Sequence, residues 1–359
     1  MKRLYVAISH HGFGHLAQTA PVLAALHAIR PDVEVLVGSC LPMDVLSQRI
    51  RTPFQCHPRI TDCNFVMHDS VRLDLPASLQ HYASFHADWP DKVAAEATWL
   101  EAQSVEAVFS NVGYLPLAGA AKASIPALAM CSLNWADLFQ HYLVRTKDVL
   151  TRNLHAEMLE AYRHAVVFLR PTPAMPMPDL PNARAIPPIA ETGANQPGVV
   201  FERLGLKADD RLVIVALGGI PHRLPIEAWP RVPGVKWLVP DAWRASHPDV
   251  HSIGATGMAF VDLLASVDAL VTKPGYGSFV EAAVHGVPVL YLPRPDWPEA
   301  PFLIDWLQHH GRAIELDAGR LARGAFLDLL ETLWAMPETG PAEAKGAAQA
   351  AAQISALLD

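Results

Sequence analysis

The chain has 359 residues, more than the roughly 250–300 at which a single hydrophobic core stops growing, so two domains are expected. Its formal charge of −8 comes with only 18% charged residues and no Lys/Arg-rich segment, which argues against nucleic acid as a partner. No apolar run approaches the roughly 18 residues of a membrane helix, and the run after Lys2 and Arg3 is too short for a signal peptide. We therefore expect a cytoplasmic protein without a transmembrane segment.

The first half of the sequence alternates between strand and helix patterns. Residues 4–8 predict a strand, residues 16–29 predict a helix, and the same alternation continues with strands at 33–39, 105–112 and 125–130 and a helix at 115–123. Each strand is almost continuously apolar, which is typical of a parallel sheet covered on both faces. Residues 1–169 are therefore predicted to form a doubly wound α/β domain.

A proline-rich segment at 170–198 is expected to link this domain to a second one, because repeated prolines remove backbone donors and prevent regular helix. Residues 199–335 then repeat the alternation, with strands at 212–217, 235–240, 268–273 and 287–293. Residues 336–359, alanine-rich from Pro341, predict a C-terminal helix that could pack back on the first domain. The expected fold is α/β, with two Rossmann-like domains whose parallel sheets face across a cleft where ligands bind.

The most informative motif is TKPGYGSFVEAAVHGVP at 272–288. Gly275 and Gly277 allow the backbone to approach a ligand, while Ser278 and Glu281 have the spacing of a capping box. A helix at 278–285 would direct its free N–H groups and positive dipole end into the cleft, which suits a diphosphate. A capped helix without any ligand would show the same pattern.

A second loop, LGGIPHR at 217–223, also follows a predicted strand. Gly218 and Gly219 could admit a phosphate or a sugar while Arg223 supplies charge, although a double glycine is often only a tight turn. Neither loop has the spacing of a nucleoside-triphosphate P-loop or a GxGxxG dinucleotide fingerprint. The motifs therefore argue against an ATPase and against a dehydrogenase.

Four segments together resemble the GT-B glycosyltransferases: GFGH after the first strand, SLNWADLF at 132–139, FVDLLASVDALVTKPGYGSFVEAAVHGVP at 260–288 and RPDWPE at 294–299. The resemblance covers nearly the whole chain and is most specific in the C-terminal block. It is nearest to the glycosyltransferase-like N-terminal region of L-arabinokinases and more distant to the N-acetylglucosaminyl transferases of peptidoglycan synthesis. The glycine- and serine-rich ATP loop of the arabinokinase's kinase half is missing from the sequence, so sugar phosphorylation is not expected.

The resemblance implies that the second domain binds a nucleoside-diphosphate sugar and that the first domain binds the acceptor. UDP is the favoured nucleotide, with dTDP and GDP open. A carboxylate at Glu281 would accept hydrogen bonds from the ribose hydroxyls. The other implied donor contacts are Phe260 and Val261 at a strand edge beside the base, Gly275, Tyr276, Gly277 and Ser278 around the diphosphate, and Asp296 and Glu299 at the sugar hydroxyls or in a merely exposed acidic loop.

The first loop, HHGFGH at 10–15, is expected to hold the catalytic base. The resemblance implies that His15 accepts the proton of the acceptor hydroxyl, and imidazole, with an ordinary pKa of about 6.5, suits that role. Gly12 and Gly14 would let the loop bend close to the substrate, and His11 is a candidate contact for acceptor or phosphate. The alternative is that His15 only caps or packs against the following helix.

One departure from the family pattern concerns the partner of this histidine. Asn111 stands where histidine-base members often have an aspartate, and asparagine can hold a tautomer but stabilises imidazolium less. Asp69 or Asp137 could supply the missing acid, or the base is a different residue. The sequence leaves these alternatives open.

The expected function is an inverting glycosyltransferase in which the helix near Ser278 stabilises the departing nucleoside diphosphate. No DxD triplet occurs, so transfer is expected to need no metal ion, and no cofactor is expected beyond the donor substrate. The alternatives are a nucleotide-sugar hydrolase or epimerase on the same scaffold and a non-catalytic nucleotide-sugar-binding protein. The acceptor and the donor sugar cannot be read from the sequence.

Overall fold

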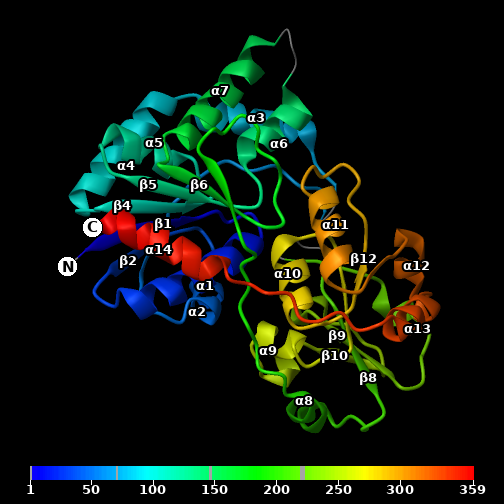
Figure 1. Cartoon of the computed structure of the whole chain (residues 1–359). Coiled ribbons are helices and arrows are strands. Elements are labelled where there is room, and N and C mark those ends of the chain that lie inside the picture. Colours follow the sequence, from blue (N-terminus) through cyan, green and yellow to red (C-terminus); the bar gives the residue numbers. More distant parts are fainter. Residues whose placement is uncertain (1, 70–71, 145–147, 219–222) are drawn as a thin grey trace. The chain divides into compact units, whose positions relative to one another are not determined.

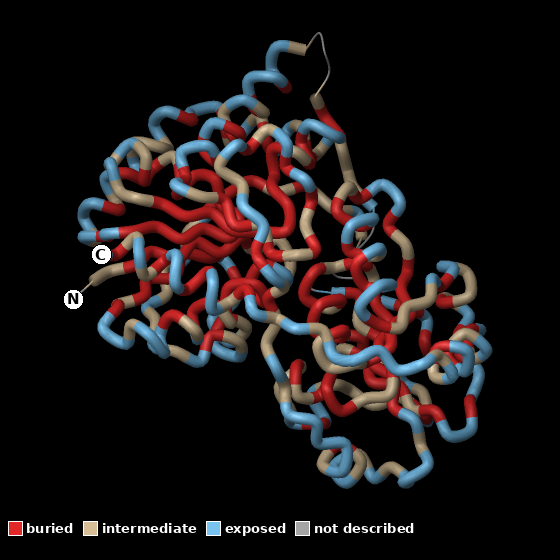
Figure 2. The backbone as a smooth tube through the Cα atoms, viewed as in Figure 1, coloured by how far each residue is buried: buried red, intermediate tan, exposed pale blue. Residues whose placement is uncertain are grey.

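The computed structural model describes residues 2–69, 72–144, 148–218 and 223–359. The chain divides into two compact units, shown in Figure 1: Met1–Ile189 together with Ala344–Asp359, and Ala190–Glu343. Figure 2 shows that the strands of each unit are mostly buried, while exposed residues gather on the outer helices and loops. Within the described ranges, no helix is both long and apolar enough to cross a membrane.

The first unit is built on a parallel sheet that contains seven strands among the described residues, in the order β3-β2-β1-β4-β5-β6-β7. The order reverses between β1 and β4, which is where open α/β sheets bind ligands. The strands are β1 (Arg3–Ile8), β2 (Glu34–Gly38), β3 (Gln55–His57), β4 (Ala107–Asn111), β5 (Ala127–Met130), β6 (Val167–Pro171) and β7 (Ala183–Ile186).

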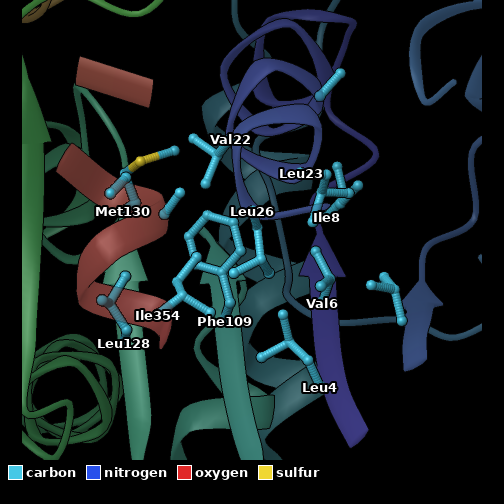
Figure 3. Packing of buried hydrophobic residues seen from close by; sticks show 14 of the residues in the cluster. Leu4, Val6, Ile8, Val22, Leu23, Leu26, Phe109, Leu128, Met130 and Ile354 are labelled. Atoms are coloured by element: carbon cyan, nitrogen blue, oxygen red, sulfur yellow. The ribbon is translucent and has the colours of Figure 1, made fainter. Parts of the chain in front are cut away.

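Helices cover both faces of this sheet, as its continuously apolar strands require. They are α1 (Gly14–Ile29), α2 (Met43–Arg49), α3 (Leu75–His86), α4 (Trp89–Ala102), α5 (Leu115–Lys122), α6 (Trp135–Leu143), α7 (Val149–Arg163) and α14 (Gly346–Leu358). The C-terminal helix α14 packs beside α1, and Figure 3 shows Ile354 next to Phe109 and Leu26 in the core. The chain thus returns to the first unit at its end.

The proline-rich segment at 170–198 contains the boundary between the units, but it is not a linker over its whole length. β6 continues to Pro171, and β7 adds a further strand to the first sheet, so the boundary between the units falls after Ile189. β7 pairs only with β6, and an edge strand tolerates neighbouring prolines because one side of its backbone needs no partner. The second unit accordingly begins at Ala190 and extends to Glu343.

The second unit repeats the architecture with a parallel sheet of six strands among the described residues, in the order β10-β9-β8-β11-β12-β13. The strands are β8 (Arg211–Val215), β9 (Val235–Val239), β10 (Val250–Ser252), β11 (Ala269–Thr272), β12 (Val289–Tyr291) and β13 (Ala313–Glu315). The helices are α8 (Pro197–Leu204), α9 (Phe260–Leu264), α10 (Tyr276–Val284), α11 (Ala300–His310), α12 (Ala318–Arg323) and α13 (Leu327–Ala335), with 3-10 turns at Ile226–Ala228, Asp241–Trp243 and Gly254–Thr256.

Two local predictions in this unit are wrong. α10 begins at Tyr276 because Gly275, with an extended backbone, is already its N-cap, and no side chain caps it. Ser278 is therefore the third residue of the helix and Glu281 lies in its second turn, so the predicted capping box does not form. Phe260 and Val261 open the helix α9 and do not lie at a strand edge.

Candidate functional site

His15 lies where the first strand of the first unit turns into a helix. It belongs to the first turn of α1, is only 6% exposed, and its Nδ1 lies 3.0 Å from Oδ1 of Asn111. Asn111 is the last residue of β4, which pairs with β1 so that Ile8 and Asn111 are neighbours. The sheet register therefore brings together two residues that are 96 positions apart in the sequence.

A chain of hydrogen bonds assigns the tautomer of His15. Nδ2 of Asn111 donates to Oε1 of Gln18 at 3.1 Å, and Nε2 of Gln18 donates to Oγ of Ser132 at 2.8 Å. With the two amides oriented in this way, the oxygen of Asn111 faces His15, and Nδ1 is the donor. Nε2 of His15 then carries the lone pair that a general base needs.

The surroundings keep His15 neutral near neutral pH. Burial lowers its pKa, and the nearby His10 lowers it further, while the Asp62 carboxylate and the hydrogen bond to Asn111 act in the opposite direction. Sγ of Cys131 lies 3.6 Å from Nδ1. A neutral imidazole with its lone pair on Nε2 can accept a proton from a hydroxyl.

The carboxylate that acts on His15 is not one that the sequence pointed to. Asp137 lies at the start of α6, where burial raises its pKa to about 6, and Asp69 forms an ion pair with Arg72. Asp62 instead is 1% exposed and accepts a hydrogen bond of 2.6 Å from Nε1 of Trp135. It lies in a loop without a recognisable motif, so only the folded structure identifies it.

The two glycines of the first loop, Gly12 and Gly14, differ in backbone conformation. Gly12 has a φ of +79°, a left-handed conformation that favours glycine, whereas Gly14 is the first residue of α1. A Cβ at either position would have no atom within 4 Å, so the surrounding structure leaves open space beside both. The ring of His11 packs edge-on against Trp135, with centroids 5.3 Å apart.

In the second unit, two cationic residues and a glycine follow the carboxyl ends of three neighbouring strands. Lys273 directly follows β11, Arg294 follows β12, and Gly218 follows β8. A Cβ on Gly218, whose φ is +85°, would lie 3.6 Å from Nζ of Lys273, so this loop lies directly beside the ammonium group. Sequence reasoning missed both cations, although Lys273 ends one predicted strand and Arg294 directly follows another.

Lys273 is an unusual lysine. Its burial and the charge of Arg294 lower its pKa to about 7, and Glu299 partly opposes this. Arg294 is 6% exposed and lies over the ring of Trp297, 4.2 Å from the centroid. Nε1 of Trp297 in turn donates to Glu299 at 3.2 Å. A partly exposed lysine and a buried arginine thus interact with one buried carboxylate.

The N-terminus of α10 adds to this positive charge. Its N-cap, Gly275, lies two residues after Lys273, and Tyr276, Gly277 and Ser278 then present the first N–H groups of the helix. These groups and the helix dipole favour an anion. Backbone donors and two cations converge on one edge of the sheet.

The remaining residues that were predicted to contact the nucleotide sugar differ in burial and in their partners. Arg223 donates to the backbone oxygen of Trp243 and pairs with Glu227, so its charge is partly used locally. Glu281 is buried on α10, Asp296 is exposed, and Glu299 is 4% exposed, so only Asp296 fits the exposed acidic loop. Gly219 lies outside the described residues.

Among residues 2–69, 72–144, 148–218 and 223–359, no group of three or more histidine, cysteine, aspartate or glutamate side chains could hold a metal ion. The four cysteines form no disulfide: Cys63 and Cys131 are buried, Cys56 is partly buried and Cys40 is exposed.

Comparison with solved structures identifies the architecture as the GT-B fold. The chain matches the glycosyltransferase of kitacinnamycin with a TM-score of 0.61 and 12% identity, covering 99% of this chain and 94% of that one. It matches the spinosyn rhamnosyltransferase SpnG with a TM-score of 0.60 and 16% identity, covering 99% and 96%. The glycosyltransferase VinC, solved with dTDP, gives a TM-score of 0.53 at 16% identity, covering 99% and 95%.

Among curated proteins, the chain is similar to L-arabinokinase of Arabidopsis thaliana, with 26% identity over 327 residues. The match covers 90% of this chain and 31% of the arabinokinase, so the chain spans less than a third of that relative. No family model matches the sequence.

Proposed function

We propose that this protein is a glycosyltransferase that moves a sugar from a nucleoside-diphosphate sugar to an acceptor hydroxyl, with inversion and without a metal ion. The proposal rests above all on the convergence of Lys273, Arg294 and the N-terminus of α10 at one edge of the second sheet. A diphosphate leaving group is stabilised by positive charge and by backbone donors, and this edge supplies both. The GT-B fold makes such a reaction the natural hypothesis.

The first unit supplies the proposed base. Nε2 of His15 accepts the proton of the acceptor hydroxyl, and the acceptor oxygen forms a bond to the anomeric carbon. The bond from that carbon to the diphosphate oxygen breaks, and the electron pair leaves with the nucleoside diphosphate. One displacement of this kind inverts the anomeric centre.

The second unit stabilises the leaving group. Lys273 and Arg294 offset the charge that develops on the diphosphate, and N–H groups of the first turn of α10 donate to its oxygens. Glu281, in the second turn of α10, is proposed to accept the ribose hydroxyls. These groups replace the metal ion that other glycosyltransferases hold with paired carboxylates.

The nucleotide is proposed to be UDP or dTDP. UDP is the choice that the sequence resemblance favours, and dTDP is supported because VinC and SpnG were solved with thymidine diphosphate. The similarity to an L-arabinokinase makes pentoses, and arabinose in particular, the first sugars to test as donor group and acceptor.

A thermal-shift screen with UDP, dTDP, GDP and their sugars tests the proposal. A ligand at about 100 times its Kd should add roughly 2.7 kcal/mol of stability. Product analysis with the best donor then separates the alternatives: a glycosylated acceptor supports transfer, free sugar indicates a hydrolase, and an altered nucleotide sugar indicates an epimerase. Binding without turnover over a broad acceptor panel would indicate a binding protein, and no binding at all would refute the proposal.

A further inference from the structure

Asp62 is a buried acid whose contacts are made with neutral groups. It is 1% exposed, and in the described part of the chain it accepts hydrogen bonds from Nε1 of Trp135 at 2.6 Å and from Oγ1 of Thr61 at 3.4 Å. Aspartate is rarely buried to this extent unless a cation or a specific role compensates the lost hydration. The indole and the hydroxyl orient the carboxylate without neutralising its charge.

The same tryptophan contacts the proposed base. The ring centroids of Trp135 and His15 lie 5.8 Å apart, and Trp135 is fully buried. The indole therefore donates to the carboxylate while its ring packs against the imidazole. Charges separated by packed side chains interact more strongly than in water, because the interior has a lower effective dielectric constant.

The other groups that face His15 cannot supply negative charge in the same way. Asn111 is neutral, His10 carries positive charge when protonated, and the thiol of Cys131 is a weak, buried neighbour. Asp62 is the acidic group that favours a protonated His15.

We propose that Asp62 is the positioning residue that stabilises the imidazolium of His15, acting across Trp135 in place of a directly hydrogen-bonded aspartate. This inference rests on the proposed function, since it gives the imidazolium a catalytic purpose. The proton of the acceptor hydroxyl moves to Nε2 of His15, and no proton passes to Asp62. Asn111 fixes the tautomer of His15 and Asp62 supplies the negative charge, whereas a directly hydrogen-bonded aspartate would do both.

The test follows the titration of His15 by NMR in protein labelled with 13C at histidine Cε1, with His15→Gln to assign the resonance. Asp62→Asn keeps an oxygen for the Trp135 hydrogen bond but removes the charge, and should lower the midpoint of the His15 titration by about one pH unit or more. Asp137→Asn, the matched control, removes a partly buried carboxylate on the same helix as Trp135 and should leave the midpoint in place. An unchanged midpoint in Asp62→Asn overturns the proposal.

A second measurement needs no variant and covers the case in which Asp62→Asn does not fold. In the parent protein, the carboxyl 13C resonance of Asp62 should show an ionised group over the whole titration of His15, with a small inflection at the His15 midpoint. A protonated Asp62, or a resonance without that inflection, contradicts the proposal.

These titrations use no substrate, so they decide the coupling between Asp62 and His15 even if glycosyl transfer is never found. Failure of the proposed function would appear instead as absent donor binding in the nucleotide screen. Where an acceptor is found, the acidic limb of the kcat/KM profile of Asp62→Asn should move to lower pH by the same amount as the NMR midpoint.

Discussion

The proposed base, His15, has an asparagine beside it where a carboxylate would be expected. Here the amide of Asn111 donates to Gln18 and accepts from His15, so it determines which ring nitrogen is protonated. Orientation and charge are separate requirements of a general base, and asparagine satisfies the first. The residue departs from the family pattern without removing the geometry for proton transfer.

Replacement of His15 should separate chemistry from binding. We expect His15→Ala to lower turnover by about 10²–10⁴-fold, the usual scale for the loss of a general base, while donor affinity stays nearly unchanged. Steady-state kinetics with calorimetric titration of the donor would measure both effects. His27→Ala, an exposed histidine on the same helix, is the control, and a fully active His15→Ala would exclude His15 from the mechanism.

Lys273 should make nucleotide binding depend on pH. Its pKa of about 7 means that it is protonated below neutral pH and largely neutral above it, and only the protonated form attracts a diphosphate. We expect the affinity for UDP or dTDP to fall from pH 6 to pH 9 more steeply in the parent than in Lys273→Met. Calorimetry in buffers of different ionisation enthalpy should also detect proton uptake on binding at pH 8. The exposed Lys207→Met is the control; identical pH profiles for parent and Lys273→Met would refute this role.

At the scale of elements, the loop between β1 and α1 offers a matched pair of glycines. Gly12 adopts a left-handed conformation and Gly14 does not, and both have space for a methyl group. Gly12→Ala should therefore cost about 1–2 kcal/mol through backbone strain, while Gly14→Ala, at the first position of a helix, should cost little. The strained variant should melt a few degrees lower, at roughly 2–4 °C per kcal/mol for a unit of this size.

Equal melting temperatures for these two alanine variants would show that the loop does not require the left-handed conformation. Because the loop carries His15, we also expect Gly12→Ala to reduce turnover more than Gly14→Ala. Differential scanning calorimetry and steady-state kinetics on the same preparations would measure both.

The sequence predicted the central strands of both sheets, but not the edge strand β7 or the first residue of α10. Buried parallel strands are continuously apolar, so residues 4–8 and 268–273 were recognisable. β7 was missed because an edge strand needs no apolar run, and its sequence ARAI lies among prolines. The start of α10 was placed two residues late because the Ser278–Glu281 spacing imitates a capping box, whereas Gly275 already has the N-cap backbone.

The candidate site could be predicted in part, because some of its residues lie at the ends of recognisable strands. His15 lies after β1 and Asn111 is the last residue of β4, and the family resemblance paired them before the strand order showed that these positions are adjacent. Lys273 and Arg294 also lie after the carboxyl ends of strands in the second unit, but the predicted anion site included only the glycines and Ser278 of this region. Asp62 had no such signal, because its place near His15 depends on the packing of Trp135.

At the scale of the whole molecule, each unit carries half of the proposed chemistry: a base in the first and an anion site in the second. The anion site needs only backbone donors and cations, so donor binding should not require a divalent ion. We expect UDP or dTDP affinity to be unchanged in EDTA. A loss of affinity on chelation that Mg²⁺ or Mn²⁺ restores would contradict metal-independent binding.

The most direct test of the central claim is a calorimetric titration that compares nucleoside diphosphates with monophosphates. If Lys273, Arg294 and the N-terminus of α10 hold the diphosphate, then UDP or dTDP should bind one per chain and at least about tenfold more tightly than UMP or dTMP, a difference of about 1.4 kcal/mol. Equal affinities for diphosphate and monophosphate, or no binding of either at millimolar concentration, would contradict the account.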